Sequence, residues 1–275
     1  MKTSIIICFY ERIEHLKCGL DALKRCAKSF HEVIVADDGS GVDTVRSIQR
    51  LIPNYDFSIV HAWHERKGAR RSASRNNGIR HATGDYLIFF DADHLVLPGT
   101  IDAHLKAARP ARFVAGNHKC LTEEQTRQVF DASPSTALIE ALYRELPEEP
   151  IIKEHRRFVR YSILRRLRLV SARKVQFAGH FSIYREDIER VNGYDENFVG
   201  WGGEDLDLSI RLVKAGFHGD SVIRQARVLH LWHPKELGNK HWKEGGNVQY
   251  FFRKHIPYFC ENGLVKDAGA NQHCA

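Results

Sequence analysis

Runs of apolar residues alternate with amphipathic stretches through the first 115 residues of the chain. Five short runs rich in β-branched and aromatic residues predict buried strands, at residues 4–9, 32–36, 57–60, 86–90 and 112–115. Between these runs, the apolar positions predict helices at residues 13–27, 42–51, 70–82 and 98–108. Strands that alternate with helices over short connections predict an α/β fold, in which a mostly parallel sheet is flanked by helices.

The alternation is less regular after residue 115. The pattern there predicts two helical stretches within 121–147, a strand at 177–184, a helix at 204–215, a strand at 222–231 and a helix from about 240 to 254. No linker, repeat or low-complexity segment separates the two parts of the chain. We therefore expect a single domain with halves at 1–115 and 116–258, followed by a loose C-terminal tail at 259–275.

Composition and charge narrow the class of protein. The chain has 275 residues and a formal net charge of +7, and 43% of its residues are hydrophobic, which is typical of a globular protein. No apolar run reaches the roughly 18 residues of a membrane span, and the N-terminal run is too short for a signal peptide. These features predict a cytoplasmic protein whose six cysteines are reduced.

The strongest local charge lies at residues 153–174, where nine Lys or Arg residues accompany one acid, Glu154. Such a run is most often a solvated helix face, and a mobile loop near an acceptor is the second interpretation. It is also compatible with peripheral contact to the inner face of a membrane. Because no zinc-finger, RRM or KH signature is present, we do not expect a nucleic-acid partner.

Two acidic turns follow predicted strands. Asp37-Asp38-Gly39-Ser40 comes after the strand at 32–36, and Asp91-Ala92-Asp93 comes after the strand at 86–90. Ligands of open α/β sheets bind beyond the carboxyl ends of the strands, so these carboxylates are candidates for binding a nucleotide or a divalent cation. Each motif is also an ordinary turn sequence, and neither one decides between the two interpretations by itself.

Two segments of the second half also carry candidate chemistry. Gly200-Trp-Gly-Gly-Glu-Asp205 leads into the helix at 204–215 and offers an aromatic face for a sugar ring. A carboxylate at a helix N-terminus could be a general base, although we expect the helix dipole to lower the pKa of Asp205; the alternative is an ordinary acidic first turn. Further on, His230 and His233 have i, i+3 spacing and could share one metal ion if the chain turns, or could be unrelated surface residues.

In this order, the motifs resemble those of family 2 glycosyltransferases with a GT-A fold, over about residues 3–255. Arg75-Asn-Asn-Gly-Ile79 and Asp91-Ala92-Asp93 are similar to the run into the family's DxD metal site, and Val35-Ala-Asp-Asp-Gly-Ser40 resembles its uridine-binding turn. Gly200-Trp-Gly-Gly-Glu-Asp205 resembles the acceptor and catalytic segment of β-1,4-galactosyltransferases, chondroitin polymerase and polypeptide N-acetylgalactosaminyltransferases.

The resemblance implies a metal-dependent, inverting transfer of a hexose or N-acetylhexosamine from a UDP-sugar. The acceptor would be a hydroxyl of a glycan, a lipid-linked glycan or a peptide. Residues 1–115 would form the nucleotide-sugar-binding half and residues 116–258 the acceptor-binding and catalytic half. Neither the donor sugar nor the acceptor follows from the resemblance.

The resemblance also implies roles for individual residues. Asp205 would be the catalytic base, and Glu204 beside it would bind hydroxyls of the donor or acceptor. Mn²⁺ or Mg²⁺ would be held by Asp93 with His230, His233 or both. The nucleotide-sugar-binding residues would be Phe9, Glu11, Arg12, Asp38, Arg71, Arg75, Asn76, Asp91 and Asp93. The acceptor-binding residues would be Trp201, Gly202 and Gly203.

Three other functions fit parts of the pattern. A sugar-phosphate nucleotidylyltransferase shares the fold, but it usually has a Gly-rich N-terminal loop that Ile5-Ile-Ile-Cys-Phe-Tyr10 lacks. A non-catalytic carbohydrate-binding protein would not need Asp93, Asp205 and His233 together. A metal-dependent hydrolase could use His230, His233 and a carboxylate. Loss of activity in EDTA, restored by Mn²⁺ better than by Zn²⁺, would favour the transferase.

Overall fold

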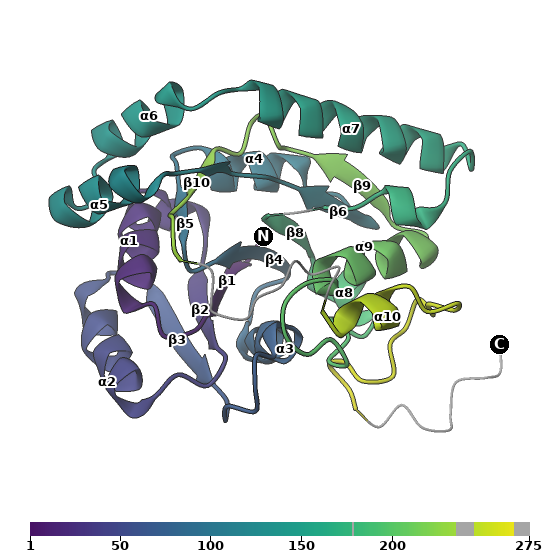
Figure 1. The fold of residues 1–275 in the computed structure, drawn as a ribbon, viewed down its shortest axis with the longest axis horizontal. Helices are drawn as coiled ribbons and strands as arrows, with labels where there is room; N and C mark the ends of the chain where they lie inside the picture. The colour runs from purple at the N-terminus through teal and green to yellow at the C-terminus, as the bar shows by residue number, and fades with distance from the viewer. Residues whose placement is uncertain (178, 235–244, 267–275) are drawn as a thin grey trace.

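The computed structural model describes residues 1–177, 179–234 and 245–266 as an α/β domain built on a seven-stranded sheet (Figure 1). The strand order is β3-β2-β1-β4-β8-β6-β9, and β8 is antiparallel to both of its neighbours while the other pairs are parallel. The strands are β1 (Thr3–Phe9), β2 (Glu32–Asp37), β3 (Ser58–Trp63), β4 (Tyr86–Asp91), β6 (Arg112–Ala115), β8 (Phe181–Tyr184) and β9 (His218–Ser221). This arrangement confirms the predicted fold class.

Helices surround the sheet, and the long helix α7 runs along one side of the molecule (Figure 1). The helices are α1 (Ile13–Leu23), α2 (Val42–Leu51), α3 (Arg71–His81), α4 (Thr100–Ala107), α5 (Glu123–Ala132), α6 (Thr136–Glu145), α7 (Glu149–Arg166), α8 (Arg185–Glu189), α9 (Glu204–Lys214) and α10 (Asn247–Phe251). The first predicted helix ends early, because residues 24–29 continue it as a 3₁₀ helix. The other helices predicted within the first 115 residues are confirmed.

The core has a layer on each face of the sheet. From β1, Ile6 enters one hydrophobic cluster while Ile5 and Ile7 enter the other. Successive residues of a strand point to opposite faces, so continuous apolar runs such as that of β1 are buried on both sides. The core thus holds the central strands rigidly, and their carboxyl ends provide a fixed edge for functional residues.

Helix α3 lies unusually close to this sheet because residue 78 is glycine. A Cβ atom at Gly78 would lie 2.7 Å from Ile6 Cγ2 and 3.0 Å from Ala36 Cβ, so a larger residue would push the helix away. The close packing fixes the first turns of α3, which carry Arg71 and Arg75.

A second, smaller sheet joins distant parts of the chain. It consists of β5 (His94–Val96), β10 (Val228–His230) and β7 (Lys119–Cys120), with β10 in the middle. In the antiparallel pair of β10 and β5, His230 lies opposite His94. The pairing therefore brings the C-terminal histidine segment next to the turn that follows β4.

Some expectations for the second half were wrong. The apolar run at 222–231 is not one strand, because a turn closed by the 2.7 Å bond from Ala226 N–H to Val222 O interrupts it before β10. The strand expected at 177–184 is limited to β8, and residue 178 lies outside the described residues. Of the helix expected at about 240–254, residues 240–244 are also outside them, and α10 spans only Asn247–Phe251.

The segment expected to be a loose tail is packed at its beginning. Cys260 is buried, and its carbonyl oxygen accepts a 2.7 Å hydrogen bond from the Asn192 side chain. Arg80 on α3 donates to the carbonyl oxygen of Leu264 at 3.0 Å. The expected tail residues 267–275 lie outside the described residues.

The first part of the basic stretch, residues 153–166, lies in α7. For this part, the interpretation as a solvated helix face is confirmed. Ile151 and Phe158 are buried toward the core, and the charged positions lie on the outer side. Past the helix, Leu167 and Leu169 are largely exposed. None of the helices within the described ranges combines the length and the apolar character that a bilayer crossing requires.

Candidate active site

The carboxyl ends of β1, β2 and β4 bring the two acidic turns to one edge of the sheet. Phe9 pairs with Asp37 across β1 and β2, and Cys8 pairs with Asp91 across β1 and β4. Because these strands are parallel and in register, both turns lie beyond the same edge, separated by the width of one strand. This is the edge at which ligands of open α/β sheets bind.

Arg75 joins carboxylates from two distant parts of the chain. Its Nη2 atom donates to Asp91 Oδ1 at 3.0 Å, and its Nη1 atom lies 3.3 Å from both Glu204 Oε1 and Asp205 Oδ1. The Arg75 side chain is only 5% exposed, so these charges are weakly screened by solvent. One guanidinium thus fixes the turn Asp91-Ala92-Asp93, named the DxD turn for its sequence pattern, against the start of α9.

Arg71 adds a second positive charge to Asp91, at 3.3 Å from Oδ2. Burial by itself would raise the pKa of Asp91, but the two arginines outweigh it and lower that pKa to about 2. Asp91 is therefore ionised at neutral pH. Both arginines also lie where an anionic ligand beyond this edge would meet them.

Asp205 has a different environment from Asp91. Burial raises its pKa to about 6; Arg75 opposes the rise, and the nearby carboxylates of Glu204 and Asp91 add to it. The expectation that the helix N-terminus lowers this pKa was wrong, because burial and like charges outweigh the dipole. The Tyr194 hydroxyl donates to Asp205 Oδ1 at 3.1 Å, and the side chain remains 26% exposed. A partly accessible carboxylate with this pKa suits a general base near neutral pH.

Asp93 meets the two histidines that the sequence singled out. The Nε2 atoms of His230 and His233 lie 3.4 and 3.3 Å from Asp93 Oδ2. Burial alone would raise the pKa of Asp93, but the bond to His233 and the neighbouring imidazoles hold it well below its usual range. The same bond raises the pKa of His233. The structure therefore brings together the three residues predicted to hold a metal ion, with both histidines in reach.

Asp38 is buried at the other acidic turn. Its Oδ2 atom accepts 2.8 Å hydrogen bonds from the Arg66 guanidinium and from the Arg70 main-chain N–H. Its Oδ1 atom is buried without a hydrogen-bond partner among the described residues, and His64 Nε2 lies 3.4 Å from it. One carboxylate oxygen is thus held by two hydrogen bonds, whereas the other has only the 3.4 Å contact with His64 among the described residues.

Three residues predicted to bind the nucleotide-sugar have side chains engaged elsewhere. Phe9 is buried in the core, and only its main-chain oxygen contacts the site by accepting from Asp38 N–H at 2.9 Å. Glu11 accepts hydrogen bonds from Gly41 N–H and the Thr44 hydroxyl at the start of α2. The Asn76 amide is buried and bonds the main chain of Tyr194. Asn76 therefore positions the segment that carries Tyr194. Arg12 lies at the start of α1.

The glycine segment before α9 has the conformation that only glycine adopts easily. Gly202 and Gly203 have φ angles of 90° and 95°, and a Cβ at Gly203 would lie 2.9 Å from the Phe198 ring. Gly202 O accepts a 2.9 Å bond from the Asn247 side chain. Trp201, directly before these glycines, is 43% exposed. The segment thus leaves an aromatic residue accessible just before Glu204 and Asp205 in the chain.

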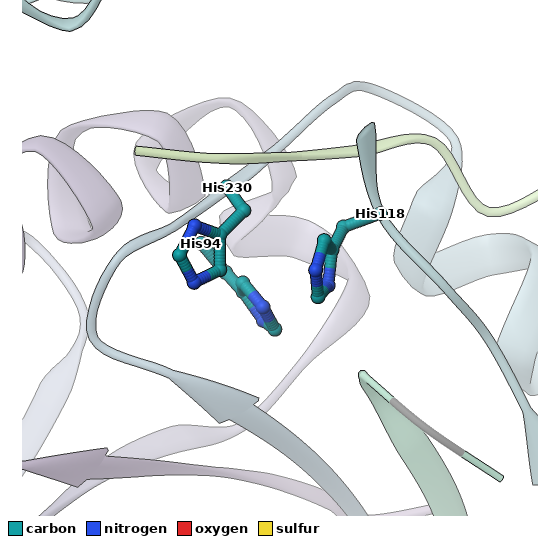
Figure 2. Close-up of side chains that lie close together, drawn as sticks. All are labelled: His94, His118 and His230. Atoms are coloured by element: carbon teal, nitrogen blue, oxygen red, sulfur yellow. The ribbon is translucent and has the colours of Figure 1, made fainter. Parts of the chain in front are cut away.

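Several residues at the site were missed by sequence reasoning. Tyr194 and Arg66 belong to no recognised motif. Only the fold places Tyr194 against Asp205 and Arg66 against Asp38. His94 directly follows the DxD turn, and His118 precedes β7; both lie beside His230 (Figure 2). The only signal for His94 was its position next to Asp93, and the sequence held no signal for His118.

Two family models match the chain. The model described as glycosyl transferase family 2 matches residues 4–168, and the model described as the N-terminal domain of galactosyltransferase matches residues 161–234. The two matched ranges overlap at residues 161–168, at the end of α7. The first covers β1, β2 and the DxD turn, and the second covers the glycine segment, His230 and His233.

Individual proteins match over most of the chain. Validoxylamine A glucosyltransferase from Streptomyces hygroscopicus subsp. jinggangensis is 31% identical over 76% of this chain and 50% of its own length. Chondroitin synthase from Escherichia coli is 26% identical over 93% of this chain and 38% of its own length. The structure of GalNAc-T7 with UDP, GalNAc and Mn²⁺ superposes with a TM-score of 0.56 at 15% identity, covering 94% of this chain and 47% of that one. The chain spans about half the length of the first curated relatives it matches.

Proposed function

Because the chain belongs to glycosyl transferase family 2, we propose that it transfers a hexose or N-acetylhexosamine from a UDP-sugar to an acceptor hydroxyl, with inversion at the anomeric carbon. One observation carries the proposal. Arg75 holds Asp91 of the DxD turn beside Asp205 of α9, so a donor bound at the sheet edge would lie next to a carboxylate suited to act as a base. Relatives named as glycan-synthesising enzymes, such as chondroitin synthase, support the assignment to glycosyl transfer.

Asp38 would bind the uracil base of the donor. Its Oδ1 atom is buried without a hydrogen bond among the described residues, with His64 Nε2 3.4 Å away, so an N–H group of a bound base would satisfy it. Arg66 and the Arg70 main chain hold the other oxygen and fix the orientation of the carboxylate. Arg71 and Asp91 would then contact the diphosphate and the ribose.

Asp93, His230 and His233 would hold Mn²⁺ or Mg²⁺. Asp93 Oδ1 is buried without a hydrogen-bond partner in the described part of the chain, and a carboxylate with two imidazoles is a donor set that Mn²⁺ accepts. When bound, the cation neutralises negative charge on the diphosphate leaving group. Solved structures of similar fold hold Mn²⁺ together with GDP-Man or with UDP, which is consistent with this assignment.

The oxygen of the acceptor hydroxyl would attack the anomeric carbon of the donor, and Asp205 would take the proton of that hydroxyl. The bond from that carbon to the UDP oxygen breaks in the same displacement, so the configuration inverts. Its pKa of about 6 keeps Asp205 ionised at neutral pH and still basic enough to accept a proton. Glu204 would bind substrate hydroxyls, and Trp201 with Gly202 and Gly203 would form the acceptor surface. The acceptor is a glycan, a lipid-linked glycan or a peptide.

The base assignment is tested by separating donor binding from transfer. Purified chain is incubated with UDP-galactose, UDP-N-acetylgalactosamine, UDP-glucose or UDP-N-acetylglucosamine, Mn²⁺ and candidate acceptors, and release of UDP is measured. Asp205→Asn should lower transfer at least about a hundredfold, the lower range for a positioned acid–base group, while the Kd for UDP with Mn²⁺ stays within about twofold of wild type. Wild-type turnover in the variant would rule out Asp205 as the base.

The same assays separate the rival functions. A non-catalytic carbohydrate-binding protein would bind sugar but release no UDP from any donor. A hydrolase that uses His230 and His233 would release UDP without an acceptor and lose that activity in His233→Asn. A transferase requires the acceptor and forms a new glycosidic product, which mass spectrometry detects.

We further propose that the chain acts in the cytoplasm and contacts the inner face of a membrane through the end of α7. Ile163, Leu167 and Leu169 are each more than half exposed, and Arg165, Arg166 and Arg168 lie among them in the sequence. Apolar side chains surrounded by arginines suit an interface of anionic lipids. Cosedimentation with phosphatidylserine-containing vesicles tests this contact. We expect binding that Leu167→Asn with Leu169→Asn weakens, and equal binding to neutral vesicles would contradict it.

A further inference from the structure

Three histidines come together beside the candidate metal site. His94 begins β5, His230 ends β10 directly opposite it, and His118 stands just before β7. The small sheet therefore gathers three imidazoles that are far apart in the sequence, and Figure 2 shows them converging from three separate segments. Neither His94 nor His118 has a part in the reaction proposed above.

The geometry is close to that of a coordination site. One ring nitrogen from each histidine lies within 4.8 Å of the others. The ring centre of His118 lies 4.9 Å from the ring centre of His94 and 4.9 Å from that of His230. Around a tetrahedral ion with metal–nitrogen distances of about 2.1 Å, ligand nitrogens are roughly 3.4 Å apart. Side-chain rotations that move each ring by about an ångström would therefore close the site.

Two of the three rings carry a nitrogen that the described residues leave without a partner. His94 Nε2 and His118 Nδ1 are buried and have no hydrogen bond, and the His94 side chain is almost fully buried. Burial of an unpaired polar atom is unfavourable, and such atoms mark places where a ligand can bind.

We propose that His94, His118 and His230 form a second cation site, specific for a transition metal such as Zn²⁺ and distinct from the Asp93 site. Three imidazoles with a water in the fourth position are a coordination set that Zn²⁺ adopts. Mn²⁺ and Mg²⁺ prefer sites with carboxylate oxygens, and the three-histidine site has none. The two sites therefore select different ions.

The two sites share His230, and this makes them compete. A neutral imidazole has one lone pair, so His230 serves only one ion at a time. In addition, His94 Nδ1 accepts a 3.2 Å hydrogen bond from the Asp91 main-chain N–H, which leaves the ring proton on Nε2. An ion at His94 Nε2 moves that proton to Nδ1, and the bond from Asp91 is lost. Zn²⁺ therefore weakens the donor site through both His230 and the DxD turn; this coupling rests on the proposed function, whereas Zn²⁺ binding itself does not.

Two variants separate the sites, because each removes a ligand of only one of them. Zn²⁺ affinity is measured by competition with a chromophoric chelator, and UDP affinity by calorimetry in Mn²⁺. His118→Asn should weaken Zn²⁺ binding at least about tenfold, since even the loss of a group behind a ligand has an effect of this size, and should leave UDP binding within about twofold. His233→Asn should weaken UDP binding in Mn²⁺ and should leave Zn²⁺ binding unchanged. Added Zn²⁺ should weaken UDP binding to wild type but not to His118→Asn.

Three results would overturn the proposal. They are an absence of Zn²⁺ binding to the wild-type chain, equal Zn²⁺ affinity of His118→Asn and wild type, and weaker Zn²⁺ binding to His233→Asn; the last two place Zn²⁺ at the Asp93 site alone. Thermal unfolding in EDTA and a second variant, His118→Gln, exclude a general folding defect. If UDP does not bind wild type with Mn²⁺, the proposed function fails, and the chelator measurement still tests the three-histidine site.

Discussion

The hydrogen bond from Tyr194 to Asp205 gives the sharpest test of the proposed base. Tyr194 is fully buried, and its hydroxyl donates to Asp205 Oδ1 at 3.1 Å. The other charged groups that face Asp205 are Arg75 and Arg71 from α3, Asp91 from β4 and Glu204 from its own helix. Tyr194→Phe removes a donor that favours the ionised carboxylate and leaves these four charges in place.

The size of the effect follows from the bond that is lost. A hydrogen bond to a charged group contributes about 1.5 kcal/mol at the low end of its range, and this end applies because Asp205 is partly exposed. That energy corresponds to roughly one pKa unit. The pKa of Asp205 is about 6 with the bond, and it should rise to about 7 without it.

The rise in pKa predicts a change in rate that depends on pH. The base must be ionised, so activity is lost as the pH falls through its pKa, and a higher pKa moves this loss to higher pH. At pH 6 the ionised fraction should fall from about one half to about one tenth, which lowers kcat/KM roughly fivefold. At pH 8.5 the two enzymes should differ by less than about 10% in this fraction.

The assay is a pH profile of kcat/KM for transfer, with Tyr86→Phe as the matched control. Tyr86 is equally buried, and its hydroxyl bonds Ser182 at 2.7 Å, away from Asp205. The acid limb should move by about one unit in Tyr194→Phe and should not move in Tyr86→Phe. Superimposable profiles for wild type and Tyr194→Phe would refute the assignment of this limb to Asp205, and so would an equal shift in the control.

Three further variants test other parts of the structure. Asp93→Asn should abolish the part of UDP affinity that depends on Mn²⁺, measured by calorimetry, and unchanged affinity would exclude Asp93 as a ligand. Arg211→Met should lower the free energy of unfolding by about 3–5 kcal/mol, because it removes the 2.6 Å partner of buried Asp207 and the donor to the main-chain oxygens of Val191 and Gly193, while Arg253 still contacts Asp207 at 2.8 Å; urea titration measures this, and a loss below about 1 kcal/mol would contradict it. Gly78→Ala should cost about 1–3 kcal/mol by overpacking against Ile6, whereas Gly246→Ala, which has open space around it, should have little effect on Tm.

The first half of the fold could be predicted because its signals are local. Ser4 to Phe9 and Tyr86 to Phe90 are continuous apolar runs, and a parallel sheet buried on both faces requires such runs. The acidic turns were found because carboxylates directly follow the runs at 32–36 and 86–90. The small sheet could not be predicted, because β5, β7 and β10 have only two or three residues each and pair across more than 100 positions.

The candidate site shows the same difference between local sequence signals and contacts that form only in the folded chain. The i, i+3 spacing of His230 and His233 only allowed them to share a ligand, and the resemblance to family 2 glycosyltransferases was needed to predict that they meet at Asp93. The roles of Asn76 and Tyr194 depend on a contact between α3 and a distant segment, which no local pattern encodes. The direction of the Asp205 pKa shift was wrong for a related reason. The helix dipole is visible in the sequence, whereas burial and the positions of Glu204, Asp91 and Arg75 exist only in the folded chain.

The proposed function requires that the chain binds a UDP-sugar through a divalent cation held by the DxD turn. Calorimetric titration with UDP, GDP, CDP and dTDP, each in Mn²⁺ and then in EDTA, measures this binding. We expect UDP to bind in Mn²⁺, the other three nucleotides to bind much more weakly, and EDTA to remove UDP binding. Equal UDP binding with and without the cation, or no binding of any nucleotide, would rule out this mode of donor binding.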